Sequence, residues 1–337
     1  MASRPDLFKI VTPINADRFQ ELLVDHPNQP FVLSVCRALH NGFWPWADSS
    51  DSSYPSINDN SMHTSKKSNE QQCFIKEQLA EEIHLGRVLG SFSMDLLLGM
   101  YSVPMHTVPK SNSDKLRLVI DHTAGDFSLN SMIDSNAIKG TKLDGLHSLG
   151  ASLLHYRKEH PDVELTLFKS DVSQAFQRLP MHPLWQVKQV LTVDGQHYVD
   201  WNNNFGRQGS PKVWISFMSL VAWIAIHKEF IDTLKLYMDN SFPFEVAGLM
   251  LHYPPYQCAF PAKQMCLLQL WDEIGIPYDH HKQLFRSPLM VIGFDVDPNA
   301  MMAILPVHKK HELVLHLSHF AMKNFCWTLC EFQQLAG

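Results

Sequence analysis

The stretches KSDVSQAF (Lys169–Phe176) and LYMDNSF (Leu236–Phe242) place two carboxylates, those of Asp171 and Asp239, at the ends of segments with strand-like composition. Asp171 closes the run ELTLFKSD, and Asp239 lies in a short polar break after the β-prone stretch Leu234–Met238. If the two strands are neighbours, the carboxylates can share divalent ions about 3.5–4 Å apart, as in two-metal phosphoryl transfer. Taken singly, either Asp is explained as a turn or cap residue.

Five more motifs surround this pair in a fixed order. They are KLRLVIDHTAGDFSLNSMI (Lys115–Ile133), NFGRQGSP (Asn204–Pro211), LWDEIGIPYDHHKQ (Leu270–Gln283), LMVIGFDVD (Leu289–Asp297) and TLCEFQQLAG (Thr328–Gly337). Taken in chain order together with the first pair, the seven motifs resemble segments of reverse transcriptases. Lys115–Ile133 resembles the fingers segment, Lys169–Phe176 the D-x-x-x-A-[FY] palm motif, and Asn204–Pro211 the Gly-Ser-Pro turn. Leu236–Phe242 resembles the Y-x-D-D hairpin, and the last three motifs resemble the helix-turn-Lys motif, the primer-grip hairpin and the segment after the palm. The resemblance covers the chain from about Pro30 to its last residue.

Two segments indicate a finer placement. HPNQPFVLSVCRALHNGFWPWAD (His26–Asp48) and DHTAGDFSLN (Asp121–Asn130) are similar to fungal retroelement polymerases of the tyrosine-recombinase retrotransposon type or a related Gypsy-like lineage. In such polymerases an RNA or DNA template with its primer and deoxynucleoside triphosphates are the partners, so the resemblance implies the same partners here.

The resemblance implies a centre of two Mg²⁺ or Mn²⁺ ions. Asp171 and Asp239 would bind the metals, helped by the backbone carbonyl of Val172. Asn240 departs from the family pattern, which usually has a second Asp at this position of the hairpin. An amide oxygen can coordinate Mg²⁺ but brings no negative charge. The site would then hold two acidic residues instead of three, which puts catalytic activity in question.

Three residues match family positions that contact the incoming nucleotide. Phe176 matches the aromatic residue that crowds the sugar 2′ side and favours deoxynucleotides, although it also suits a protein core. Lys110 and Arg117 match fingers residues that hold the triphosphate, where Arg offers a fork to phosphate oxygens and Lys a compact charge. Both also suit a solvated surface.

The remaining implied residues lie in the Gly-Ser-Pro and helix-turn-Lys motifs. Gln208, Gly209 and Ser210 would lie beside the incoming nucleotide and template, although Gly-Ser-Pro is also an ordinary helix start with Ser210 as the cap. Lys282 matches the Lys that protonates the departing pyrophosphate, and its two histidine neighbours favour a role as an acid. A surface loop is the alternative for Lys282.

Composition and charge limit the class of protein. The chain has 337 residues, of which 45% are hydrophobic, enough for one large or two modest globular domains. The 28 basic and 34 acidic residues give a net charge of −6, which argues against tight nonspecific binding to phosphates. Local basic groups, namely Lys110, Lys115 and Arg117 in the fingers and Lys309, Lys310 and His311 in the expected thumb, compensate or are solvated surface charges.

Several features predict an intracellular protein, cytoplasmic or nuclear. The six cysteines form no CxxC pair, and no hydrophobic signal segment opens the sequence. The apolar run Val213–Ile226 is too short for a membrane span and predicts a buried helix. We therefore expect no membrane partner, and the oligomeric state stays open.

The pattern of elements predicts an α+β fold with helices on one face of an antiparallel palm sheet. The expected organisation is that of right-hand polymerase fingers and palm with a partial thumb: an N-terminal helical extension over residues 1–47, a polar linker or loop over 48–72, fingers and the start of the palm over 73–160, the palm over 161–300 and a partial thumb or connection over 301–337. Helices are expected at Phe74–Leu85, after Pro211 and at Pro261–Ile274.

Two hypotheses follow. The first is an RNA-directed DNA polymerase that adds deoxynucleotides to a primer 3′ end. The second is a catalytically decayed retroelement remnant, truncated where relatives continue beyond Gly337, that acts, if at all, as a nucleic-acid or protein binding module.

Overall fold

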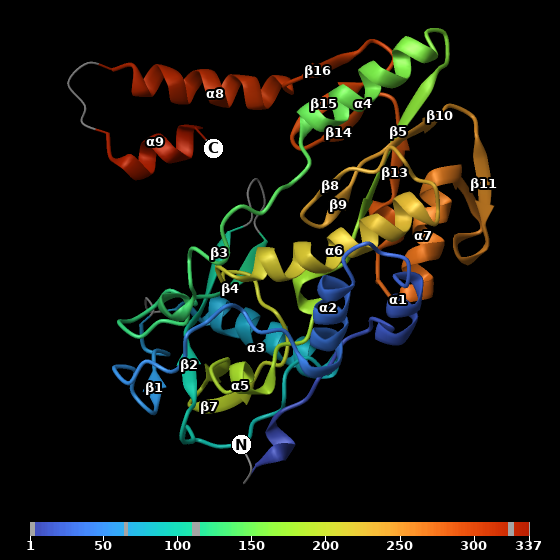
Figure 1. The fold of residues 1–337 in the computed structure, drawn as a ribbon. Coiled ribbons are helices and arrows are strands. Elements are labelled where there is room, and N and C mark those ends of the chain that lie inside the picture. Colours follow the sequence, from blue (N-terminus) through green and yellow to red (C-terminus); the bar gives the residue numbers. More distant parts are fainter. Residues whose placement is uncertain (1–3, 64–66, 110–114, 323–326, 337) are drawn as a thin grey trace. The chain divides into compact units, whose positions relative to one another are not determined.

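The computed structural model describes residues 4–63, 67–109, 115–322 and 327–336. The chain forms two compact units, each assembled from three separate stretches (Figure 1). Unit 1 comprises Met1–Leu143, Val172–Asp232 and Leu267–Asp279, and unit 2 comprises Asp144–Asp171, Thr233–Cys266 and His280–Gly337. Each unit mixes helices with antiparallel strands, so the expected α+β class is confirmed. The division of the chain into an N-terminal extension, linker, fingers, palm and partial thumb is not tested by these two units and stays a prediction.

Unit 1 surrounds a small mixed sheet and a β-hairpin with helices. Its helices are η1 (Pro5–Leu7), α1 (Ala16–Leu22), α2 (Gln29–Asn41), α3 (Asn69–His84), η2 (Asn130–Met132), η3 (Ala175–Arg178), α5 (Pro183–Gln186), α6 (Ser210–His227) and the C-terminal part of α7 (Ala262–Ile274). Strands β1 (Asn58–Asp59), β2 (Tyr101–Val103), β6 (Val190–Val193) and β7 (Gln196–Val199) form one sheet in that order. Strands β3 (Met105–Pro109) and β4 (Leu116–Ile120) form a separate hairpin.

Helix α6 lies at the centre of unit 1 because it is apolar on almost every side. Val213, Trp214, Phe217 and Val221 are all buried along it. A helix that is hydrophobic all round has no face suited to water and becomes a core helix. The helix expected after Pro211 is therefore present, and it is buried as its composition predicts.

Three local expectations differ from the structure. Helix α3 begins at Asn69 instead of Phe74, because Ser68 and Gln71 form a reciprocal capping box that extends the helix by more than a turn. Ser210 does not cap α6: Gly209 is the N-cap, and the Ser210 hydroxyl is buried inside the first turn. The polar stretch expected as a linker also contains β1, which pairs in parallel with β2.

Unit 2 is organised around β5 (Leu165–Asp171), a strand that pairs on both sides. On one side lie β9 (Asn240–Ser241) and β10 (Phe244–Val246), which keep a single antiparallel register along β5. On the other side lies β13 (Leu284–Arg286). Strand β8 (Leu236–Tyr237) pairs with β9 and completes the sheet.

The other elements of unit 2 cover or extend this sheet. They are α4 (Leu146–Glu159), the hairpin β11 (Met250–Tyr253) and β12 (Cys258–Pro261) with η4 (Pro254–Tyr256) between its strands, the first turn of α7, η5 (His280–Lys282), the three-stranded sheet β14 (Leu289–Val291), β15 (Phe294–Asp297) and β16 (Met302–Ile304), and the helices α8 (Val307–Phe320) and α9 (Leu329–Ala336). Within the described residues, no helix combines the length and apolar composition that a membrane crossing requires.

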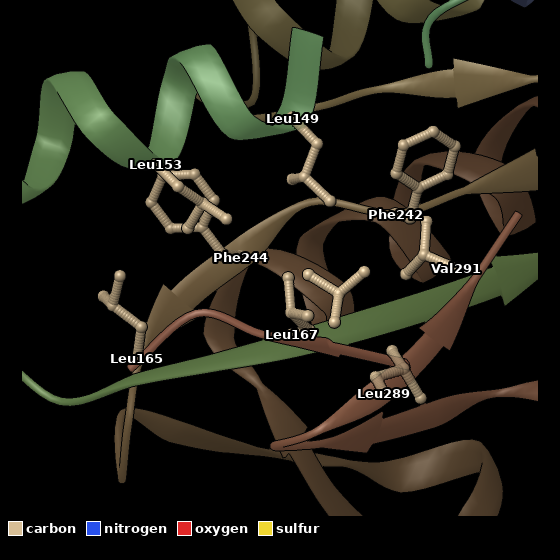
Figure 2. Close-up of a cluster of buried hydrophobic side chains, with 9 residues drawn as sticks. Leu149, Leu153, Leu165, Leu167, Phe242, Phe244, Leu289 and Val291 are labelled. Carbon is tan, nitrogen blue, oxygen red and sulfur yellow. The ribbon is translucent and has the colours of Figure 1, made fainter. Parts of the chain in front are cut away.

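The core of unit 2 lies between α4 and the β5 sheet. Figure 2 shows Leu149 and Leu153 of α4 pointing toward Leu165 and Leu167 of β5, with side chains of β10 and β14 beside them. Leu167 is completely buried. Burying an aliphatic side chain of this size contributes about 1.5–3 kcal/mol, so this cluster holds β5 firmly in place. Asp171 at the end of β5 therefore lies on a rigid support.

Candidate active site

The two acidic motifs of the sequence meet on neighbouring strands of unit 2. Asp171, the last residue of β5, lies directly opposite Asn240, the first residue of β9. Asn240 in turn pairs with Tyr237 of β8, so Met238 and Asp239 form a two-residue hairpin loop. Met238 has a φ of 55°, the positive value that a type II′ hairpin turn requires at its first loop position. The register therefore brings Asp171 beside the Asp239 hairpin.

Polar side chains brace the end of β5 from two directions. The Ser241 hydroxyl donates to the carbonyl oxygen of Ser170 over 3.1 Å. From the first turn of α7, Gln264 Nε2 donates to Ser170 Oγ at 3.2 Å and to the Lys169 carbonyl at 3.4 Å. Ser170 and Gln264 are completely buried, so these bonds are shielded from water. The backbone that carries Asp171 is fixed on both sides.

Lys282 lies in the same site. Its ammonium donates to Asp171 Oδ1 at 2.9 Å. Lys282 is the last residue of η5, two residues before β13, whose Leu284 pairs with Lys169 near the end of β5. The side chain of Asp171 is 16% exposed and that of Lys282 is 42% exposed. Lys282 was expected from sequence either at the catalytic site or in a surface loop, and the structure brings it to the carboxylate.

Electrostatics distinguish the two carboxylates. Burial, and then the nearby negative charge of Asp171, raise the pKa of Asp239 above its ordinary value. The Asn240 amide opposes this rise, because its Nδ2 donates to Asp239 Oδ1 over 2.9 Å. A bound cation would relieve the cost of ionising Asp239 in this site.

The donor set suits a hard divalent ion. Carboxylate oxygens come from Asp171 and Asp239, and the Asn240 amide oxygen is available because the amide nitrogen is engaged with Asp239. Mg²⁺ prefers oxygen ligands, and one or two carboxylates together with substrate phosphates are its usual partners. Within the described part of the chain, no three His, Cys, Asp or Glu side chains are grouped so that they could hold a metal by themselves. A metal in this site would thus need oxygens from Asn240, the backbone or the substrate.

The other residues implied by the resemblance belong to unit 1. Val172 follows Asp171 directly in the chain, and its side chain is buried. Arg117 is exposed on β4 of the β3–β4 hairpin, paired with Val108. Lys110 lies outside the described residues. The roles of these three as metal or triphosphate ligands stay predictions.

The Gly-Ser-Pro segment is held by unit 1 itself. Gln208 is exposed, and its backbone N–H donates to Asn130 Oδ1 at 3.0 Å. A Cβ at Gly209 would lie 2.9 Å from the carbonyl oxygen of Pro45, so close packing explains this glycine without any ligand. The Ser210 hydroxyl donates within the protein interior, to Asn203 and Asn204.

Phe176 is 6% exposed, and Phe205 lies over it. The ring centroids of Phe176 and Phe205 are 4.5 Å apart and nearly parallel, and Trp214 packs at 6.2 Å from Phe176. Phe205 is 55% exposed, so it presents the accessible ring of this stack. Sequence reasoning singled out Phe176 and missed Phe205. The signal available was its place in NFGRQGSP, three residues before Gln208.

A buried polar network supports the same segment, and sequence reasoning missed it as well. Arg207 is 2% exposed and donates to Gln189 and to Asn203 at 3.3 Å. Burial lowers the pKa of Arg207 to about 9. Asp200 is 4% exposed, accepts from the N–H of Asn202 and from Asn204 Nδ2, and has its pKa raised by burial to about 6.

The imidazole of His122 is buried without hydrogen bonds. Its side chain is 1% exposed and neither ring nitrogen has a hydrogen-bond partner. Burial, together with the positive charge of Arg207, holds the pKa of His122 well below its ordinary value. The segment from Asp200 to Ser210 therefore carries an interior of polar groups whose burial costs stability.

Solved structures of other proteins share the fold of this chain. No protein-family model and no curated protein matches the sequence. Among solved structures, the foamy viral protease-reverse transcriptase in complex with double-stranded DNA is similar over 98% of this chain and 63% of that chain, with a TM-score of 0.57 and 15% identity. The same viral protein in complex with an RNA/DNA hybrid covers 98% of this chain and 40% of that chain, with a TM-score of 0.55 and 15% identity. The chain spans less than two thirds of the length of these neighbours. It has a reverse-transcriptase-like fold.

Proposed function

We propose that this protein is a reverse-transcriptase-like nucleotidyltransferase, which adds deoxynucleotides to a primer 3′ end under the direction of an RNA or DNA template. One observation carries the proposal: the register of β5, β8 and β9 sets Asp171 beside the Asp239–Asn240 hairpin, where Lys282 also donates to Asp171. A turn or cap role for each Asp would not require the two motifs to share adjacent strands. The solved neighbours support the proposal because their polymerase chains are complexed with double-stranded DNA and an RNA/DNA hybrid.

The residues of the site divide the work of phosphoryl transfer. Asp171, Asp239 and the Asn240 amide oxygen would hold two Mg²⁺ or Mn²⁺ ions, with the Val172 carbonyl as a further ligand. When bound, such ions activate the 3′-hydroxyl and neutralise charge that develops on the transferring phosphate. Lys282, on the same side of the site as Asp171, would deliver a proton to the departing pyrophosphate.

Nucleotide recognition is assigned to unit 1. Arg117 and Lys110 would bind the triphosphate, and Gln208, Gly209 and Ser210 would lie near the base pair. Phe176 would limit space at the sugar 2′ position. We further propose a retroelement origin and an intracellular setting for the reaction.

A second function is favoured by Asn240. It removes one negative charge from the hairpin, and the chain as a whole carries a net charge of −6. Both features fit a palm that has lost catalysis and retains a nucleic-acid or protein binding role.

Primer extension separates the two functions. The full chain is supplied with an RNA template, a DNA primer, deoxynucleotides and Mg²⁺ or Mn²⁺, and it is compared with Asp171→Ala and Asn240→Asp. Extension by the native chain that vanishes in Asp171→Ala supports the polymerase. Primer extension by Asn240→Asp alone means that the fold is intact and that only the metal ligand at position 240 is missing. No extension by any of the three proteins supports the binding module.

Two controls make the result specific. Asp162→Ala changes an exposed Asp in unit 2 outside the site, so it should extend primers as the native chain does. Extension that persists in Asp171→Ala would refute the assignment of the catalytic carboxylate.

A further inference from the structure

Asp171 has unlike neighbours on its two sides. On the β9 side it faces the neutral Asn240, and Lys282, the last residue of η5 before β13, donates to its Oδ1 at 2.9 Å. The site thus joins two carboxylates, one amide and one ammonium. With both carboxylates ionised, these groups sum to a single negative charge.

This balance is unfavourable for a free divalent ion. One oxygen of Asp171 is already engaged by an ammonium, and a cation that approached it would meet the positive charge of Lys282 at close range. A second hairpin Asp would have restored the negative charge, and Asn240 does not. The site therefore attracts a metal by itself only weakly.

The Lys282 side chain is also placed so that it can separate from Asp171. Its side chain is 42% exposed, whereas that of Asp171 is 16% exposed, so the Lys282 side chain has room to move on its solvent-exposed part. A Lys is a compact charge on a flexible stem and can move to a new anion without disturbing the backbone. The triphosphate of an incoming nucleotide is an anion of this kind.

We propose that Lys282 is an exchangeable counter-ion: it neutralises Asp171 while no nucleotide is bound, and it transfers to the triphosphate when nucleotide and metal bind together. The inference rests on the proposed function and deepens it. It makes metal binding conditional on nucleotide, because the nucleotide removes the ammonium that competes for Asp171. Metal and nucleotide then bind with positive coupling, and each raises the affinity for the other by the same factor.

The test measures metal binding directly. Mn²⁺ is titrated into the full-length protein without nucleotide, and free Mn²⁺ is followed by electron paramagnetic resonance. Lys282→Met keeps the length of the side chain and removes its charge, so it should bind Mn²⁺ about tenfold more tightly than the native chain. Lys282→Arg keeps the charge and should bind as the native chain does.

Nucleotide provides the second readout. A non-hydrolysable deoxynucleoside triphosphate analogue should increase the Mn²⁺ affinity of the native chain by a larger factor than that of Lys282→Met, because the variant has no ammonium to displace. Asp171→Asn in either background should abolish the difference. Thermal unfolding of each variant checks the fold, and Lys282→Gln repeats the measurement with a second neutral side chain.

Two outcomes would overturn the inference. One is an unchanged or weaker Mn²⁺ affinity in both Lys282→Met and Lys282→Gln with the fold intact, and the other is the absence of Mn²⁺ binding in all variants. The proposed function fails separately. If Lys282→Met binds Mn²⁺ more tightly but the native chain does not extend primers, the counter-ion role of Lys282 is supported and the polymerase function is rejected. If the native chain extends primers but Lys282→Met binds Mn²⁺ with unaltered affinity, the polymerase function is supported and the counter-ion role is rejected.

Discussion

Replacing Asp200 by Asn should make the protein more stable at neutral pH than at acidic pH, relative to the native chain. Asp200 is 4% exposed and accepts hydrogen bonds from the N–H of Asn202 and from Asn204 Nδ2. Burial outweighs these bonds and raises its pKa from 3.8 to about 6. The native chain thus carries a buried carboxyl that is ionised at neutral pH at a cost in stability.

The size of the effect follows from the two pKa values. Their difference, from 3.8 to about 6, corresponds to about 3 kcal/mol at about 1.4 kcal/mol per pKa unit. Because the folded pKa is raised, the favourable contribution of Asp200 is fully present below about pH 4 and is lost as the pH rises through about 6. An Asn side chain has no such titration. The free energy of unfolding of Asp200→Asn minus that of the native chain should therefore increase by about 2 kcal/mol from about pH 4 to about pH 7, since part of the total change falls outside this window.

Neighbouring groups do not reverse this slope. The Arg207 pKa, lowered to about 9, still leaves Arg207 protonated in both states across this pH range. The depressed pKa of His122 gives a slope of opposite sign, with stability lost as the pH falls below about 6.5, but it is common to both proteins and cancels in the difference. The amide introduced by Asp200→Asn accepts one hydrogen bond fewer than the carboxylate. This lowers the free energy of unfolding of the variant by about 1 kcal/mol at every pH and does not change its dependence on pH.

Urea unfolding followed by tryptophan fluorescence at several pH values measures the difference. Asp59→Asn makes the same chemical change at an exposed position of unit 1 and is the matched control. A flat or falling difference for Asp200→Asn would refute the reasoning. Equal m-values in both proteins are required for the comparison.

Three further predictions concern packing, the brace and the exposed ring. Leu167→Ala should lower the free energy of unfolding by about 2–5 kcal/mol in urea titrations, because Leu167 is completely buried; a loss below about 1 kcal/mol would contradict its place in the core. If the native chain extends primers, Gln264→Leu should lower kcat more than it changes KM, because it removes the donor to Ser170 and loosens the strand that carries Asp171; an effect on KM alone would argue against positioning. Phe205→Ala should leave the free energy of unfolding within about 1 kcal/mol, because the ring is 55% exposed, while raising KM for deoxynucleotides; unaltered nucleotide kinetics would exclude Phe205 from recognition.

Much of the fold was accessible from the sequence because its signals are local. The apolar run before Asp171 and the short break around Asp239 predict strands and a turn, and the structure contains β5 and the β8–β9 hairpin there. The capping box of Ser68 and Gln71 was equally local, and it would have placed the start of α3 correctly. The pairing of β5 with β9 came from the order of motifs, not from the strands themselves.

The parts that the residue patterns alone do not determine depend on distant contacts. Lys282 was expected at the catalytic site only through the resemblance, because its contact with Asp171 joins residues 111 positions apart in the chain. Asp200 and Arg207 belong to a segment rich in Asn, which has the composition of a surface loop, yet both are buried. Burial of such groups depends on the surrounding packing, so composition alone wrongly predicts that they are exposed.

The interleaving of the two units affects how the protein is made. Unit 1 needs Leu267–Asp279, whose Trp271 and Ile274 are completely buried, and unit 2 begins at Asp144 but takes Lys282 and β13 from beyond that stretch. Neither unit can be completed on the ribosome before most of the chain has been synthesised, so the usual order in which an N-terminal domain folds first is not open to it. Until then Leu149 and Leu153 of α4 lack the side chains of Phe244 and Val291 that bury them, and slower translation or chaperone binding at this stage should raise the yield of native protein.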